Sequence, residues 1–270
     1  MKCERPPFLI VRPLGNELPP RDHAGSRIEA LRVILETEHL DGADRLWILN
    51  RVWHQSLRQE YLKLLESHGE RSVELPFSPE EYLKAPDRAA KKIQVMGLNA
   101  ARSFGRRLGV EQGYEYIVSL DGDCTIFPLQ WSKICRDISE EEQRSDPRRY
   151  FSLPMIRCTS SEVRQHRAPE RPFGEPSLIF HRTATEDYNP ALSFADGNRQ
   201  ELLYRLGHRR EPERQHEIHP GAKTRVTGLV AHVATGPWEA EMSYHVRCRL
   251  REEATDLIFR EIDQALSRST

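Results

Sequence analysis

Two carboxylates separated by one glycine are the residues of this chain best suited to chemistry. Asp121 and Asp123 follow residues 114–120, a run rich in β-branched and aromatic side chains that predicts a strand. Gly122 between them lets the backbone turn sharply and approach a ligand closely. Carboxylates in this arrangement suit Mg²⁺ or Mn²⁺ held jointly by protein, water and the phosphates of a nucleotide diphosphate. Taken alone, the tripeptide is weak evidence, because Asp-Gly-Asp more often marks a solvated turn.

The elements before this motif alternate between short apolar runs and amphipathic stretches, a pattern typical of strands and helices in a parallel sheet. Strands are expected at residues 8–11, 46–49, 73–77 and 114–120, and helices at 26–35, 57–65 and 93–108. Ser26 and Glu29 have the spacing of a capping box that opens the first helix. In an open α/β sheet, ligands bind beyond the carboxyl ends of the strands, which is where the acidic pair is expected.

The second half of the chain is less regular. Strands are expected at residues 150–156, 177–180 and 226–233, and helices at 200–206 and 249–266. The polar segments 139–149 and 160–176 are predicted to be loops that close over a substrate.

Charge and cysteine usage exclude several classes of function. Lys and Arg number 40 against 41 Asp and Glu, a balance that argues against a general binder of nucleic acid or membrane surfaces. The five cysteines form no CxxC pair and suit free thiols in a reducing compartment, so a cytoplasmic location is expected. No apolar stretch approaches the roughly 18 residues of a transmembrane segment, and the run at residues 8–11 is too short for a signal-peptide core.

Residues 96–105, then 113–123, then Pro128 follow one another in an order that resembles a known family. They are similar to the family 2 type of nucleotide-sugar glycosyltransferases with the glycosyltransferase-A fold, in which a helix bearing an Ala-Arg-Asn-x-Gly motif precedes a strand that ends in a DxD metal site. Ser103 stands where that family usually has Asn. The resemblance is good over residues 93–128 and extends in architecture over residues 8–130.

The resemblance implies a single Rossmann-like α/β domain of the glycosyltransferase-A type, with a mixed, mainly parallel sheet. Its nucleotide-sugar-binding half would span residues 1–135, its acceptor half residues 136–248, and a C-terminal helix residues 249–270. Asp121 and Asp123 would bind Mn²⁺ or Mg²⁺ bridging the donor diphosphate. The nucleotide and its sugar would lie beside Arg12, Asn16, Asn50, Arg51 and Arg102. On a helical projection Arg102 also lies opposite the apolar stripe, where a solvated side chain is the alternative.

The acidic pair needs partners from the second half of the chain. A C-terminal histidine completing the metal site is known in this fold class, and His232 is the candidate, although its apolar surroundings also suit a hydrogen-bonded core histidine. Inverting glycosyl transfer requires a carboxylate that deprotonates the acceptor hydroxyl. Asp196 is the first candidate for this base, followed by Glu186 and Asp187, and each is also compatible with a plain surface carboxylate.

The leading hypothesis is a metal-dependent glycosyltransferase that moves a sugar from a nucleotide-diphosphate sugar to an unknown acceptor hydroxyl on a glycan, lipid or small molecule. No nucleic-acid partner is expected. One alternative is a sugar nucleotidyltransferase, which would be expected to have a Gly-rich basic loop after the first strand, whereas residues 12–17 contain one glycine. The other alternative is a non-catalytic nucleotide-binding domain of the same fold.

Overall fold

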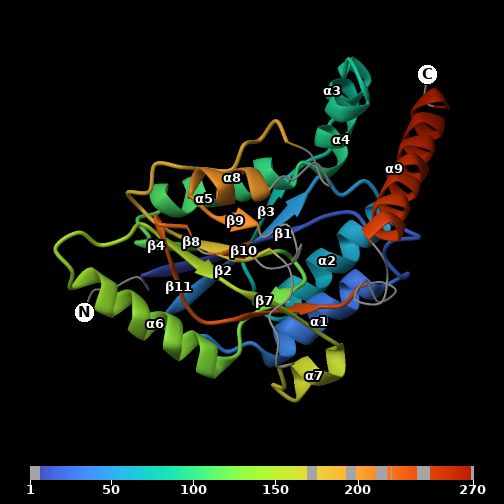
Figure 1. Ribbon diagram of the computed structural model, residues 1–270. Coiled ribbons are helices and arrows are strands. Elements are labelled where there is room, and N and C mark those ends of the chain that lie inside the picture. Colours follow the sequence, from blue (N-terminus) through green and yellow to red (C-terminus); the bar gives the residue numbers. More distant parts are fainter. Residues whose placement is uncertain are drawn as a thin grey trace.

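The computed structural model describes residues 7–168, 175–192, 199–210, 218–219, 221–235 and 244–268 (Figure 1). Its centre is a seven-stranded sheet in the order β3-β2-β1-β4-β8-β6-β11. In that order the strands are β3 (Ser72–Leu75), β2 (Ala43–Asn50), β1 (Phe8–Leu14), β4 (Tyr116–Ser119), β8 (Ser177–His181), β6 (Tyr150–Leu153) and β11 (Thr224–Val226). Only the pairs that β8 makes with β4 and β6 are antiparallel. The prediction of a mixed, mainly parallel α/β sheet is therefore confirmed.

Two smaller sheets complete the strand pairing of the described residues. The first joins β5 (Cys124–Thr125), β12 (Val230–Val233) and β7 (Met155–Cys158), and the second joins β9 (Arg209–Arg210) to β10 (Ile218–His219). In the first sheet, β12 runs antiparallel to β5, and His232 pairs directly with Cys124. This pairing brings the second half of the chain beside the acidic motif.

Helices cover both faces of the large sheet (Figure 1). The helices of the described residues are α1 (Ser26–Thr37), α2 (Gln55–Ser67), α3 (Pro79–Lys84), α4 (Arg88–Met96), α5 (Leu98–Glu111), α6 (Pro128–Glu142), α7 (Ser160–Arg164), α8 (Gln200–Arg205) and α9 (Tyr244–Ser267). Alternate residues of β1 point to opposite faces: Leu9 and Val11 pack in a cluster with Ala101 of α5, while Phe8 and Ile10 pack in a cluster with Trp131 of α6. The sheet thus has an apolar core on both sides, as a strongly parallel sheet requires. None of the described helices is long and apolar enough to cross a membrane.

The start of α1 differs from the predicted capping box. Gly25 is the capping residue and Ser26 is already helical, without a side-chain cap. The carboxylate of Glu17 instead accepts hydrogen bonds from the backbone N–H groups of Gly25, at 3.0 Å, and Arg27, at 3.2 Å. A carboxylate from the preceding loop therefore satisfies the helix end, and the expectation for Ser26 and Glu29 is wrong.

The long helix predicted over residues 93–108 is in fact two helices, because the chain breaks at Gly97 between α4 and α5. Downstream of the break, α5 lies very close to the sheet: a Cβ on Gly105 would come within 2.2 Å of a Val11 side-chain carbon. The predicted loops also need correction, since residues 139–142 form the last turn of α6 and residues 160–164 form α7.

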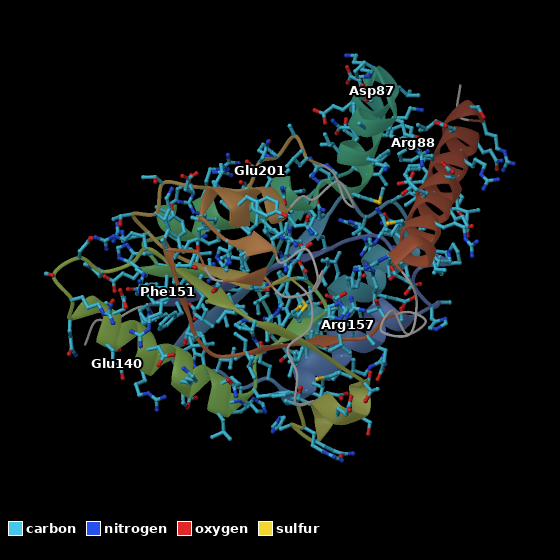
Figure 2. All side chains as sticks on the ribbon, in the orientation of Figure 1. Asp87, Arg88, Glu140, Phe151, Arg157 and Glu201 are labelled. Atoms are coloured by element: carbon cyan, nitrogen blue, oxygen red, sulfur yellow. The ribbon has the colours of Figure 1, made fainter. Side chains whose placement is uncertain are left out.

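Upstream of the break, α3 and α4 project from the body and lie beside α9 (Figure 1). Val95 and Met96 of α4 belong to an apolar cluster with Ile258 and Phe259 of α9. Arg88 lies on the side of α4 that faces α9 (Figure 2), where it bonds Glu252 at 2.7 Å and also Asp256. The C-terminal helix therefore supports α4.

A fully buried ion pair anchors the chain that follows the acidic motif. Arg12 donates to Glu38 at 2.5 Å and to the carbonyl oxygen of Cys124 at 2.9 Å, and both charged side chains are 0% exposed. The same oxygen of Glu38 accepts from the Thr125 hydroxyl at 3.0 Å and the Ile126 N–H at 2.9 Å. Burial lowers the pKa of Arg12 despite the adjacent carboxylate. β1, the end of α1 and β5 are thereby held together.

We predict that Glu38→Gln lowers the free energy of unfolding by about 3–5 kcal/mol, because it leaves the buried Arg12 guanidinium without a counter-charge. Urea denaturation measures this change. Glu36→Gln, in the last turn of the helix that Glu38 caps, is the matched control: its carboxylate is 41% exposed and pairs with Arg164, so it should cost less than about 1 kcal/mol. Equal costs for the two variants would show that the buried pair does not anchor the fold.

Candidate functional site

A cavity of about 120 Å³ lies at the carboxyl ends of β1, β2 and β4. It is the position at which open α/β sheets bind ligands. The described residues that line it are Pro13, Gly15, Asn16, Leu18, Arg21, Arg27, Asn50, Val95, Met96, Leu98, Asp121, Gly122, Asp123 and His232. The structure therefore brings together five of the residues singled out from the sequence: Asn16, Asn50, Asp121, Asp123 and His232.

The acidic motif is pressed against the first strand. A Cβ on Gly122 would lie 2.4 Å from the carbonyl oxygen of Pro13, so this position has no room for a side chain. The glycine thus allows β1 and the motif to form adjacent walls of one cavity.

Asp121 lies between two arginines from distant parts of the chain. One carboxylate oxygen bonds Arg102 of α5, and the other bonds Arg199, which immediately precedes α8. Burial acts to raise the pKa of Asp121, but the two guanidinium charges outweigh it and hold the pKa well below its usual value. Asp121 is therefore ionised at neutral pH and joins α5 to α8.

Arg102 is buried because the chain between β8 and α8 crosses the outer side of α5. Ser103 donates to the carbonyl of Tyr188 at 3.2 Å, and the Arg102 guanidinium lies 5.3 Å from the centre of the Tyr188 ring. The Arg102 side chain is 2% exposed, so the alternative of a solvated Arg102 is wrong.

Asp123 faces a histidine delivered by the small sheet. Its Oδ2 lies 3.4 Å from Nε2 of His232, and its backbone carbonyl accepts from the Val233 N–H at 2.8 Å. Burial acts to raise the pKa of Asp123, but the contact with His232 and the charge of Arg27 outweigh it, so the pKa lies below its usual value. This pair brings one carboxylate oxygen and one imidazole nitrogen together at the cavity wall.

The donor set of this wall fits a hard divalent cation. Carboxylate oxygen and imidazole nitrogen together suit Mn²⁺, and carboxylates suit Mg²⁺. Both oxygens of Asp121 already accept hydrogen bonds from arginines, so Asp123 and His232 are the better placed ligands. Cys124 also lies close, with its sulfur within 4.8 Å of oxygens of both aspartates, but burial raises its pKa well above the usual value. A protonated thiol is a poor ligand, and we exclude it from the set.

Two arginines that the sequence analysis did not single out also line the cavity. Asp22 holds both: its carboxylate bonds Arg21 at 2.8 Å and Arg27 at 2.9 Å. The carboxylate further accepts from the Leu18 N–H at 3.1 Å and the Thr235 hydroxyl at 3.2 Å. No spacing rule marks these residues, because they lie in a loop and in a first helical turn, where charged side chains are common.

The remaining predicted nucleotide-binding residues have other partners. Arg12 belongs to the buried pair with Glu38, so its side chain does not line the cavity as expected. Asn16 spans the loops with its amide, which donates to the carbonyls of Arg51 and Val95 at 2.9 and 3.2 Å and accepts from a backbone N–H at 2.7 Å. Arg51 donates to the Asn50 side chain at 2.9 Å. Asn16 and Arg51 thus support the cavity rim.

The candidates for the base are not gathered at the cavity. Glu186 pairs with Arg205 and lies 3.5 Å from the ammonium of Lys223, while Asp187 pairs with Arg106 at 3.1 Å. Neither carboxylate is among the described residues that line the cavity. Asp196, the first candidate, lies outside the described residues.

Comparison with models of protein families and with curated proteins gives no match. Solved structures that resemble the chain include Staphylococcus aureus TarS, with 10% identity and a TM-score of 0.45 over 84% of this chain and 36% of that one. TarS 1–349 gives the same identity and TM-score over 92% and 70% of the two chains. A protein of Desulfovibrio desulfuricans G20, assigned as a nucleotide-diphospho-sugar transferase, gives 9% identity and a TM-score of 0.42 over 97% of both chains.

The chain thus spans about a third of the full TarS chain that it matches. At identities of 9–10% and TM-scores below 0.5 these likenesses carry no argument about function, and the chemistry of the cavity has to come from the side chains of this chain.

Asp22 makes the stability of the fold depend on pH. Burial acts to raise its pKa, but Arg27 and Arg21 outweigh it, so the pKa is lower in the folded chain than in the unfolded one. Its ionised form therefore stabilises the fold above about pH 4, and this contribution is lost as the pH falls toward the folded pKa. Lowering the pH from about 5 to about 3 reduces the free energy of unfolding of wild type. We predict that the same change of pH reduces the free energy of unfolding of Asp22→Asn by less, because the variant has no carboxylate at this position to protonate.

Urea denaturation at a series of pH values measures this difference. Asp146→Asn changes an exposed carboxylate and should follow the wild-type curve. A curve for Asp22→Asn that runs parallel to wild type would contradict the assignment of Asp22 as the counter-charge of the two arginines.

Proposed function

We propose that the chain is a glycosyltransferase that moves a sugar from a nucleotide-diphosphate sugar to an acceptor hydroxyl, with Mn²⁺ or Mg²⁺ as its cofactor. The observation that supports this most is the meeting of Asp123 with His232 at the carboxyl end of β4, beside a second aspartate fixed by two arginines. A bound cation would offset the negative charge that builds on the leaving diphosphate.

Different residues around the cavity would bind different parts of the donor. Asp123 and His232 would hold the cation. Asp121 positions α5 and α8 through Arg102 and Arg199 and so fixes the wall that faces the donor. Val95, Met96 and Leu98, with α9 behind the first two, provide an apolar surface for the base or the sugar ring, while Asn50 offers a polar edge.

We further propose that residues 1–135 bind the donor and residues 136–248 the acceptor, which is a glycan, lipid or small molecule. His232 and Arg199 come from the second part and contact the aspartates of the first, which supports a reaction site where the two parts meet. Asp196 stays the first candidate for the base, because Glu186 and Asp187 are engaged by cationic side chains. The free thiols of Cys124, Cys135, Cys158 and Cys248 suit the cytoplasm as the place of reaction.

Thermal unfolding with a panel of nucleoside diphosphates and their sugar conjugates tests the proposal. Ligand at about a hundredfold excess over its dissociation constant stabilises the native state by about 2.7 kcal/mol, which for a chain of this size raises the midpoint by several degrees. We expect one nucleotide to give a larger shift with Mn²⁺ or Mg²⁺ than without it. If no nucleotide shifts the thermal midpoint, even with metal, the proposal is contradicted.

Asp123→Ala should abolish the metal-dependent part of the shift while leaving the fold intact, because it deletes the oxygen ligand beside His232. Asp146→Ala, at an exposed aspartate outside the cavity lining, serves as the control and should keep the whole shift. An undiminished metal-dependent shift in Asp123→Ala would contradict the assigned metal site.

A further inference from the structure

We infer that Arg21 and Arg27 form a phosphate-binding subsite that engages the diphosphate of the donor without help from a metal ion. The inference rests on the proposed function for the identity of the donor, and it adds two residues to which no role has been given. The ligand chemistry is that of a phosphoanion, to which a planar guanidinium can donate two parallel hydrogen bonds.

The two arginines face the same cavity as the acidic motif. Both line it together with Asp123 and His232. Their side chains are only 13% and 16% exposed, so they are not surface arginines that extend freely into water.

Asp22 holds these guanidiniums in place before any ligand arrives. Its carboxylate is 0% exposed and has four partners, namely the two arginines, the Leu18 N–H and the Thr235 hydroxyl. Thr235 belongs to the segment just after β12, so the second half of the chain helps to fix the subsite. Positioning of this kind reduces the entropy that a ligand must remove on binding.

Two guanidiniums gather at one carboxylate on this side of the cavity, because Asp22 bonds both Arg21 and Arg27. A guanidinium attracts the negative charge of a phosphate and can donate two parallel hydrogen bonds to it. An uncharged sugar offers no such charge.

The N-terminus of α1 does not provide the subsite. Glu17 already accepts hydrogen bonds from the N–H groups of Gly25 and Arg27, so these donors are used within the chain. Recognition of the anion therefore depends on the guanidinium side chains, and replacing one of them should lower the affinity for the anion.

Calorimetric titration with inorganic pyrophosphate in the presence of a chelator tests the subsite apart from any metal. We expect wild type to bind, and Arg21→Gln to bind about 10- to 100-fold more weakly, because one charge-assisted contact is lost. Arg21→Gln leaves Arg27 to neutralise Asp22 and so should fold. Arg107→Gln, at an exposed arginine of α5, is the control and should bind as wild type does.

Arg27→Gln should weaken binding to a similar degree, and Arg27→Lys should recover part of the loss, since the charge returns without the planar fork. The thermal midpoint of each variant, measured without ligand, reports whether it is folded. A failure of wild type to bind pyrophosphate without metal would overturn the inference, as would unchanged binding by Arg21→Gln.

Two further titrations separate this inference from the proposed function. A nucleoside without phosphate should show no difference between wild type and Arg21→Gln, whereas its diphosphate should show the loss. If pyrophosphate binds and Arg21→Gln weakens it while no nucleoside diphosphate binds more tightly than pyrophosphate, the phosphate subsite stands and the assignment of a nucleotide-sugar donor fails.

Discussion

The site depends on how the chain balances the negative charge of its acidic motif. Asp121 is held by guanidiniums from two distant segments, and without them a carboxylate in this position would face the cost of partial burial alone. The same contacts fix α5 against α8. The ion pairs that neutralise Asp121 therefore also assemble the wall of the cavity. Asp123 faces His232 and the charge of Arg27, and we propose it as the ligand of a cation.

A second set of interactions fixes the position of the acidic motif relative to the sheet. The buried pair of Arg12 and Glu38 bonds the three residues after Asp123, and β12 pairs with β5 on the other side. A buried pair of this kind is not a source of net stability by itself. Moving the chain would separate its two charges inside the protein, which is costly, so few alternative positions of the chain are possible. It specifies where the motif lies. The arm formed by α3, α4 and α9 completes the site, since α4 supplies two apolar side chains to the cavity wall.

Much of the first half could be predicted from the sequence, because local patterns dominate there. The strands at residues 8–11, 46–49 and 114–120 were marked by apolar runs, and the acidic pair follows the last of them as expected. Predictions failed where a distant residue competed with a local one. Glu17 caps α1 in place of Ser26, and Glu38 removes Arg12 from the cavity. Periodicity also could not show that Gly97 interrupts the long helix.

The functional residues that sequence reasoning missed share one property, namely that their partners are not local or carry no recognisable spacing. Arg199 meets Asp121 across 78 positions of the chain. Arg21 and Arg27 become significant only because both share Asp22 and reach the cavity.

The most direct test of the central claim is a crystal structure with Mn²⁺ and a nucleoside diphosphate, in which anomalous scattering locates the metal. We predict one strong anomalous peak within coordination distance of Asp123 and His232, with the diphosphate between that peak and the two arginines held by Asp22. A peak at another position, or a nucleotide bound away from the carboxyl ends of β1 and β4, would contradict it.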